Sequence, residues 1–175
     1  MRIRRGAVGA AVLLVVMGIA ATGCSGSEDG GVEPTTAAEP WDPCSLSDAA
    51  LQQAGLDPAT EGPGVTTSFP GWKDCAWDGD AYGVTVSASA TETVDHFRNF
   101  PGTIDFQEVR VAGRQAFTHR EERDEPGTFC WLVVPFQDGG VMSMQVDRSP
   151  FTKDTTPMCE WAVRVGEALV PDMPA

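Results

Sequence analysis

Four cysteines constrain the fold of this 175-residue chain more strongly than any other feature. They all lie after residue 40: Cys44, Cys75, Cys130 and Cys159. An even number of cysteines in a small exported domain usually forms disulfide bonds, and four cysteines allow three pairings. Zinc and thiol redox chemistry are disfavoured, because the chain has no CxxC pair and neither His96 nor His119 has a ligand at metal spacing. The sequence therefore predicts two structural disulfides and no metal or cofactor site.

The surroundings of these cysteines favour one pairing. Cys44 and Cys159 each lie at a predicted helix start, whereas Cys75 and Cys130 each lie in an apolar, strand-like run beside a tryptophan. We therefore predict the bonds Cys44–Cys75 and Cys130–Cys159, which join a helix start to a strand in each half of the domain. The sequence also allows the other two pairings.

The N-terminal residues have the three parts of an export signal. Three arginines stand within the first five residues, residues 7–20 form an uncharged apolar run, and residues 21–24 read Ala-Thr-Gly-Cys. This tetrad resembles the bacterial lipobox, which implies cleavage after Gly23 and attachment of acyl chains to Cys24. We predict a signal peptide over 1–23 and an anchor at Cys24 on the outer face of the cell membrane; a signal anchor or a secreted protein with a chance cysteine is the alternative.

Composition separates a linker from a folded domain and excludes one class of function. Residues 24–40 are rich in small, polar and acidic side chains, which cannot offset the entropy of ordering, so we predict a lipidated cysteine and a flexible linker there. Residues 41–175 form the predicted domain. The chain carries 25 Asp and Glu against 12 Lys and Arg, a formal charge of −13. We expect no nucleic-acid binding, because that function depends on neutralising phosphates with basic side chains.

Capping residues and apolar periodicity predict a mixed domain. Ser45 or Ser47 is the expected N-cap of the first helix. The predicted helices cover residues 45–54, 91–100 and 156–170. The predicted strands cover residues 74–77, 83–90, 106–111, 115–118, 129–136 and 141–146, with a further short strand considered at 65–68. Residues 119–127 hold six charged residues of nine and are predicted to form a solvated hairpin tip.

These elements indicate an α+β domain. We predict an antiparallel sheet of about five to six strands, with the helices at the N- and C-terminal ends of the domain packed on one face, and two disulfides. The opposite face decides between two possibilities. A face rich in Ser, Thr and acidic residues would be exposed to solvent, whereas a partly apolar one would be a candidate groove.

No group of residues in the sequence forms a recognisable catalytic motif. The chain lacks a GxSxG nucleophile elbow, and both histidines are predicted to be surface residues. Two acidic groups could gather calcium through oxygen ligands, although neither follows the EF-hand loop: Asp78 with Asp80, and Glu121, Glu122, Asp124 with Glu125. Trp77, Trp131 and Trp161 are expected to pack on the disulfides, and Trp72 is expected to be either a binding edge or a lid over the end of the core.

Four ordered segments together resemble the DUF3558 family of exported actinobacterial lipoproteins of undefined function. They are Trp41-Asp42-Pro43-Cys44 before a helix, Cys75-Ala76-Trp77, Cys130 at the start of a strand, and Cys159-Glu160 at the start of a last helix that ends at Val170-Pro171. The resemblance implies an envelope location and two disulfides, and it carries over no catalytic residue.

Three functions are compatible with these features. The first is a non-catalytic, membrane-anchored domain that binds another envelope protein. The second is a carrier or sensor of a small apolar or lipidic ligand, held in a cavity between helices and sheet. The third is a cell-wall hydrolase, which requires two converging carboxylates or a Ser or His pair in a cleft. The sequence does not identify the ligand or the partner.

Overall fold

A computed structural model describes residues 38–64, 69–124 and 127–175 of the chain. The predicted signal peptide, Cys24, most of the linker and the short strand considered at 65–68 lie outside the described residues. Among the residues that are described, no helix combines the length and the apolarity needed to cross a lipid bilayer.

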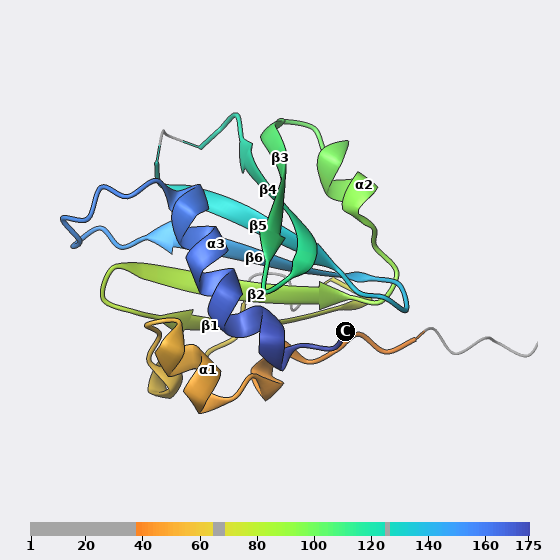
Figure 1. The fold of residues 1–175 in the computed structure, drawn as a ribbon, viewed down its shortest axis with the longest axis horizontal. Helices are drawn as coiled ribbons and strands as arrows, with labels where there is room; N and C mark the ends of the chain where they lie inside the picture. The colour runs from red at the N-terminus through yellow and green to blue at the C-terminus, as the bar shows by residue number, and fades with distance from the viewer. Residues whose placement is uncertain (1–37, 65–68, 125–126) are drawn as a thin grey trace, which may run out of the picture. The chain divides into compact units, whose positions relative to one another are not determined.

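Helical segments flank a run of strands (Figure 1). The helices are α1 (Asp48–Gln53), α2 (Val94–Arg98) and α3 (Met158–Leu169), with the 3₁₀ turns η1 (Pro43–Ser45), η2 (Pro58–Thr60) and η3 (Val170–Asp172). Ser47 is the N-cap of α1, because its hydroxyl accepts a hydrogen bond from the Ala50 N–H at 3.2 Å. The helix is followed by Gly55, whose φ of 79° is the left-handed conformation expected at a helix end.

Six strands form one antiparallel sheet. They are β1 (Trp72–Asp78), β2 (Tyr82–Ser89), β3 (Thr103–Val111), β4 (Arg114–Glu121), β5 (Phe129–Pro135) and β6 (Val141–Arg148), in the spatial order β1-β2-β6-β5-β4-β3. The chain therefore leaves β2 near one edge and returns as β3 at the other. The intervening residues 90–102, which include α2, bridge the width of β6, β5 and β4.

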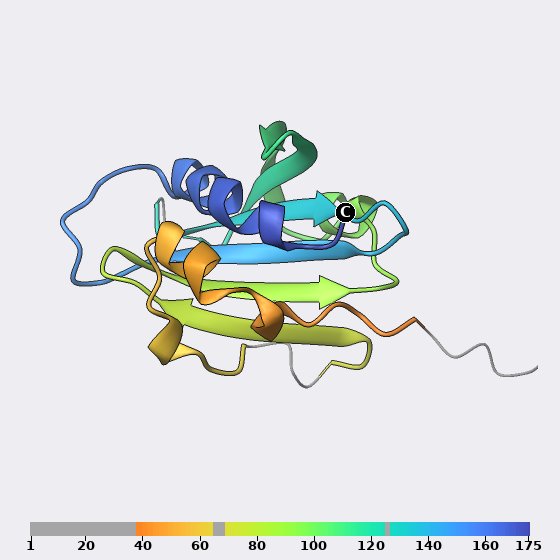
Figure 2. The same ribbon diagram turned by 60° about the horizontal axis from the view of Figure 1, so that its bottom comes forward.

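The main core lies between the sheet and the pair α1 and α3, which share one side of it (Figure 2). Alternate residues of the central strands point into it, as the period of a strand requires: Cys130, Leu132 and Val134 of β5, and Met142, Met144 and Val146 of β6. Gly166 lets α3 approach closely, because a Cβ there would lie 2.6 Å from Leu132 Cδ2. The predicted placement of the two terminal helices on one face is confirmed.

Both disulfides have the predicted pairing. Cys44 is bonded to Cys75 with a Cα–Cα distance of 5.3 Å, and Cys130 is bonded to Cys159 with a Cα–Cα distance of 5.0 Å. The first bond links η1 to β1, and the second links α3 to β5. Each bond therefore fixes a helical segment to the sheet on the side of the main core.

The prediction of a solvated tip over residues 119–127 is wrong at its start. Strand β4 continues to Glu121, and His119 is only 3% exposed instead of lying on the surface. Asp124 is also buried, and its carboxylate accepts hydrogen bonds from Arg120 and Thr128. The high charge of this segment indicated an exposed loop, although its first residues belong to a strand whose alternate side chains point inward.

Candidate functional site: a pocket between α2 and the sheet

Helix α2 lies on the face of the sheet opposite to α3. The residues of β4 and β5 that it approaches, His119 and Trp131, alternate with Thr118 and Cys130, which face α3. This second face of the sheet is therefore partly apolar, as expected for a face that carries a groove.

Aromatic side chains attach the short helix to the sheet. Phe97 contacts Trp72 of β1 with ring centroids 6.3 Å apart, and it contacts His119 at 6.1 Å. The hydroxyl of Thr103 donates a hydrogen bond to the Phe97 carbonyl at 2.9 Å. Helix α2 has only five residues, and its N-cap Thr93 makes no side-chain capping bond. Since such a short helix has little stability of its own, its position depends on these ring contacts.

Strands β4 and β5 supply the floor of the site. His119 and Trp131 are direct partners in the antiparallel register, and their rings are nearly parallel, at 3°, with centroids 5.9 Å apart. Phe106 of β3 stacks on the other side of the cluster, with its centroid 5.9 Å from that of His119. The floor is therefore a row of flat rings on neighbouring strands.

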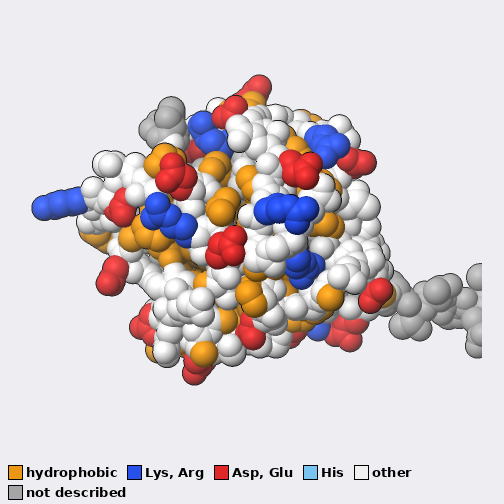
Figure 3. Space-filling model, viewed as in Figure 1, with side chains coloured by type: hydrophobic (Ala, Val, Ile, Leu, Met, Phe, Trp, Pro, Cys, Tyr) orange, Lys and Arg blue, Asp and Glu red, His pale blue; other side chains and the backbone are white. Residues whose placement is uncertain are grey.

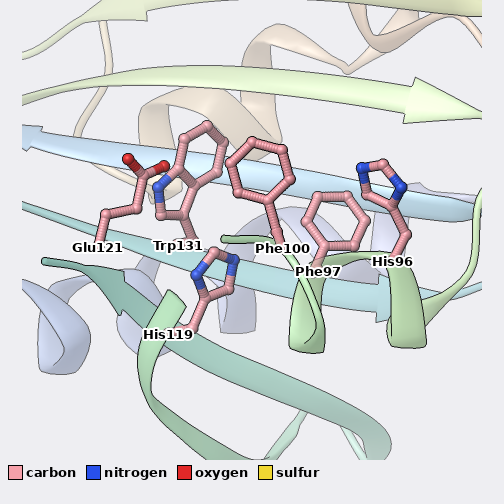
Figure 4. Close-up of a pocket in the computed structure, with 6 residues that line it drawn as sticks. All are labelled: His96, Phe97, Phe100, His119, Glu121 and Trp131. Atoms are coloured by element: carbon pink, nitrogen blue, oxygen red, sulfur yellow. The ribbon is translucent and has the colours of Figure 1, made fainter. Parts of the chain in front are cut away.

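A cavity of about 120 Å³ separates this floor from α2. It is lined mostly by apolar surface from His96, Phe97, Phe100, His119, Glu121 and Trp131 (Figure 4). The cavity is partly open to solvent. Phe100 is 50% exposed and His96 is also exposed, so these two α2-side residues form the rim. The Nδ1 atom of His96 lies 3.0 Å from a carboxylate oxygen of Glu92.

Buried polar atoms lie beneath the lining of this space. Among the described residues, the Trp131 indole nitrogen has no hydrogen-bond partner, and the ring of His119 has no side-chain partner and interacts only with the backbone of Arg120. All three nitrogens are buried, and a buried polar group left unpaired costs about 1–3 kcal/mol. Native structures contain few such groups, and each calls for an explanation. These nitrogens have almost no accessible surface, so the cavity itself presents the faces and edges of the rings rather than free polar atoms.

The electrostatics of the site favour an uncharged imidazole. Burial lowers the pKa of His119, and this effect outweighs the opposing effects of a hydrogen bond with the Arg120 backbone and of the Glu121 charge. Glu121 is the one carboxylate among the lining residues, and it accepts a hydrogen bond from Arg123 on the exposed side. Near neutral pH the floor therefore carries an uncharged imidazole, an indole N–H and a compensated carboxylate.

The remaining residues singled out in the sequence fall in different places. Trp77 is buried in the main core as expected, and Trp161 packs on Tyr82 with ring centroids 4.7 Å apart. Trp131 was expected to pack on a disulfide; it lies instead on the opposite face from Cys130, because neighbouring residues of a strand point to opposite sides. Trp72 contacts α2 and so belongs to the second face.

The calcium and metal hypotheses gain no support from the described residues. Glu121 and Asp124 are engaged by Arg123 and Arg120. Glu125 lies outside the described residues. One group of potential metal ligands is close together, Cys44, Glu61 and Cys75, but its two sulfur atoms form a disulfide and so offer no thiolate.

The other faces of the molecule are less informative. On the α3 side, acidic, basic and apolar side chains are interspersed over the surface (Figure 3). A shallow hollow beside α3 is lined by Gln107, Val109, Thr118, Cys159, Glu160, Val163 and Arg164. Its lining includes none of the unpartnered buried polar atoms of the described residues. The pocket under α2 is therefore the strongest candidate for a functional site.

Comparison with known proteins agrees with the resemblance seen in the sequence. No curated protein and no solved structure matches the chain significantly. The family model DUF3558, described as a protein of unknown function, matches residues 19–172, which include both disulfides and the whole sheet. The chain belongs to the DUF3558 family.

Proposed function

We propose that this protein is an exported lipoprotein, anchored to the outer face of the cell membrane through Cys24, whose domain binds a small molecule without transforming it. Support for the anchor comes from the basic start, the apolar run and the Ala-Thr-Gly-Cys tetrad. Several acyl chains on one cysteine would hold the protein stably, whereas a single chain binds a membrane only marginally. We also propose that the protein comes from an actinobacterium.

One observation carries the binding role: a partly open, mostly apolar cavity under α2, lined by aromatic rings and by Glu121. Small-molecule sites have this character, an apolar lining with a few placed polar groups. The carrier or sensor hypothesis requires a cavity between a helix and the sheet, and the pocket under α2 meets that requirement. Binding to an envelope protein stays a prediction from the sequence.

A hydrolase is a weaker proposal for this pocket. Its described lining residues include one carboxylate, Glu121, so they do not provide the pair of acids that most glycosidases use. They include no serine, threonine or cysteine that His119 could activate as a nucleophile. Binding is therefore the function that the lining supports best.

Native mass spectrometry of the protein released from its own membrane tests both parts of the proposal. We expect a diacylglyceryl adduct on Cys24 and a second, noncovalent mass that His119→Phe removes. Lys153→Gln is the control, because it changes an exposed residue that does not line the pocket and should keep the mass. An unmodified Cys24 would refute the anchor, and a wild-type protein with no retained mass and no affinity for any extract of its own membrane would refute the binding role.

A further inference from the structure

The pocket under α2 also indicates the chemical class of its ligand, an inference that rests on the proposed function. We propose that it binds a quaternary ammonium group, with the methyl groups against the aromatic rings and the positive charge near the Glu121 carboxylate. The size of the cavity, the rings that line it and the position of Glu121 each support this class. The group belongs either to a free organic cation or to a lipid headgroup.

The cavity has the size of such a group. An engineered apolar cavity of about 150 Å³ in another protein accepts benzene. The cavity here measures about 120 Å³ and is partly open to solvent. A nitrogen with three methyl groups is smaller than benzene, so it fits inside, while the fourth substituent leaves past the half-exposed Phe100. A complete acyl chain or a sugar polymer is too large to be enclosed.

Aromatic rings supply most of the lining. Phe97 and Phe100 come from α2 and the turn after it, and Trp131 comes from β5 (Figure 4). The face of an aromatic ring attracts a cation, most strongly in tryptophan. Because a quaternary ammonium group has no N–H, it can exchange water for ring surfaces without losing a hydrogen bond. The neighbouring rings already hold one cation, since the Arg98 guanidinium carbon lies 5.0 Å from the centroid of Phe106.

Glu121 supplies the negative charge. Its side chain is only 11% exposed, and it lines the cavity together with the rings. Arg123 compensates this charge from the solvent side, but its own side chain is 80% exposed, and exposed ion pairs are weak. The hydrogen bond from Arg123 reaches Oε2, and among the described residues no hydrogen bond reaches Oε1. A cation in the cavity would approach the carboxylate from its less exposed side, where water screens the attraction less.

The other groups at the site do not oppose a positive charge. Burial lowers the pKa of His119, so its imidazole is uncharged near neutral pH. At the rim, His96 lies beside the Glu92 carboxylate, which offsets any charge on that ring. The adjoining hollow shares Glu121 with the cavity and is also lined by Glu122. An anionic ligand would therefore be repelled, whereas a cation is attracted.

Three probes separate the parts of this proposal. They are choline, its uncharged carbon analogue 3,3-dimethylbutan-1-ol, and ethanolamine, which keeps a positive charge but lacks the methyl groups. The protein is the full mature chain with Cys24→Ser, which removes the lipid and keeps every described residue. Binding is followed by NMR through the Trp131 indole N–H signal, assigned with Trp131→Phe. In 0.15 M salt we expect choline to bind at least tenfold more tightly than either analogue, a difference of about 1.4 kcal/mol.

Two charge variants test the role of Glu121. Glu121→Gln keeps the size of the side chain and should reduce the preference for choline over the uncharged analogue to less than threefold. Arg123→Gln should tighten choline binding at least twofold, because the carboxylate loses its competing partner. If Glu121→Gln does not fold, the wild-type preference for choline and the Arg123→Gln result decide the question.

Matched controls make the same changes of charge away from the pocket. Glu61→Gln removes a negative charge and Lys153→Gln a positive one, each at an exposed residue that does not line the cavity. In 0.15 M salt the Debye length is about 8 Å, so distant charges are screened and both variants should bind choline as the wild type does. An equal effect of Glu61→Gln and Glu121→Gln would show that only the overall negative charge of the chain attracts the cation, and would overturn the proposal.

Vesicles distinguish the two sources of the group. If it belongs to a lipid headgroup, the protein should sediment with phosphatidylcholine vesicles and not with phosphatidylglycerol vesicles, and choline should release it. If the ligand is a free cation, the protein should bind choline and sediment with neither vesicle. Each of these results supports the proposed class.

The remaining outcomes contradict the proposal in different ways. Binding of the uncharged analogue or of ethanolamine as tightly as choline would overturn the quaternary ammonium class while leaving a small-molecule site in place. No shift by any probe, together with a noncovalent mass on the native protein, would also refute the ligand class alone. No shift by any probe and no retained mass would refute the proposed function as well.

Discussion

Replacing His119 with phenylalanine should make the ligand-free protein more stable, which is an unusual expectation for a residue in the interior of a sheet. The substitution keeps a flat ring between Phe97, Phe106 and Trp131, all of which contact His119 now. It removes both ring nitrogens, which are buried and have no side-chain partner among the described residues. The change therefore removes a desolvation penalty without opening a cavity.

The magnitude follows from the burial of those nitrogens. An unpaired buried polar group costs about 1–3 kcal/mol, and the Arg120 backbone can pair at most one of the two buried ring nitrogens. The phenyl ring is larger than the imidazole, and overpacking typically costs about 1–3 kcal/mol; the adjoining cavity of about 120 Å³ can take up part of the extra volume. We expect a net stabilisation of about 1–3 kcal/mol, which for a domain of this size corresponds to a rise in Tm of roughly 4–12 °C.

Urea denaturation at pH 7.5, followed by far-UV circular dichroism, measures this change on the mature Cys24→Ser chain with both disulfides intact. His96→Phe is the control and should stay within about 0.5 kcal/mol of the wild type, because His96 is exposed. A loss of stability of 1 kcal/mol or more in His119→Phe would refute the reasoning. Such a loss would mean that both ring nitrogens of His119 are hydrogen-bonded in solution.

Three further outcomes are expected from the same unfolding measurement. Burial lowers the pKa of His119, so below about pH 6.5 the unfolded chain binds a proton at this residue more readily than the folded chain does. The wild type should therefore lose stability relative to His119→Phe between pH 7.5 and 5.5. A constant difference between the two proteins would contradict this. Replacing Cys130 and Cys159 together with alanine opens a loop with a sequence separation of 29 and should cost about 3.5 kcal/mol in the chain-entropy model, whereas a cost below 1 kcal/mol would show that the bond contributes little. Gly166→Ala should destabilise the fold by about 1–3 kcal/mol despite the better helix propensity of alanine, because its Cβ would lie 2.6 Å from Leu132 and 2.8 Å from Val111; a more stable variant would show that α3 can shift.

The effects of other charged and titratable side chains must be separated from the effect of His119 in the pH experiment. Glu121 on β4 and the exposed His96 on α2 both line the same pocket, and Arg98 of α2 lies over the neighbouring Phe106 ring. Burial also raises the pKa of Asp147 on β6, which acts in the opposite direction, since a carboxyl with a raised pKa favours folding as the pH falls. The comparison with His119→Phe isolates the histidine, because these other groups are common to both proteins.

Much of the architecture could be predicted from the sequence because its signals are local. Gly139 and Gly140 mark the turn between β5 and β6, and each cysteine stands beside a helix start or a strand. The repetition of the cysteine contexts was enough to choose the correct pairing among three. These features depend on residues that are near one another along the chain.

The pocket could not be predicted, because it depends on contacts between distant segments. Phe97 is more than 20 residues from His119 and from Trp72, yet it touches both rings. The charged residues around His119 indicated a solvated tip, although the alternation of Phe117, His119 and Glu121 was a strand signal that extended past Thr118. Trp131 was assigned to the disulfide by sequence adjacency, when strand geometry assigns it to the other face.

The passage of residues 90–102 across the sheet has a consequence for how proteins with this strand order can diversify. Strand β3 lies at the opposite edge of the sheet from β1, so the chain between β2 and β3 must cross the sheet. Here it crosses the face opposite to α3, and its helix α2 covers the pocket. The disulfides and the packing of α1 and α3 lie on the first face, so changes in this crossover leave them untouched. Energetic effects at separated sites are usually additive, so the crossover can acquire a new specificity while the opposite face maintains the stability of the fold.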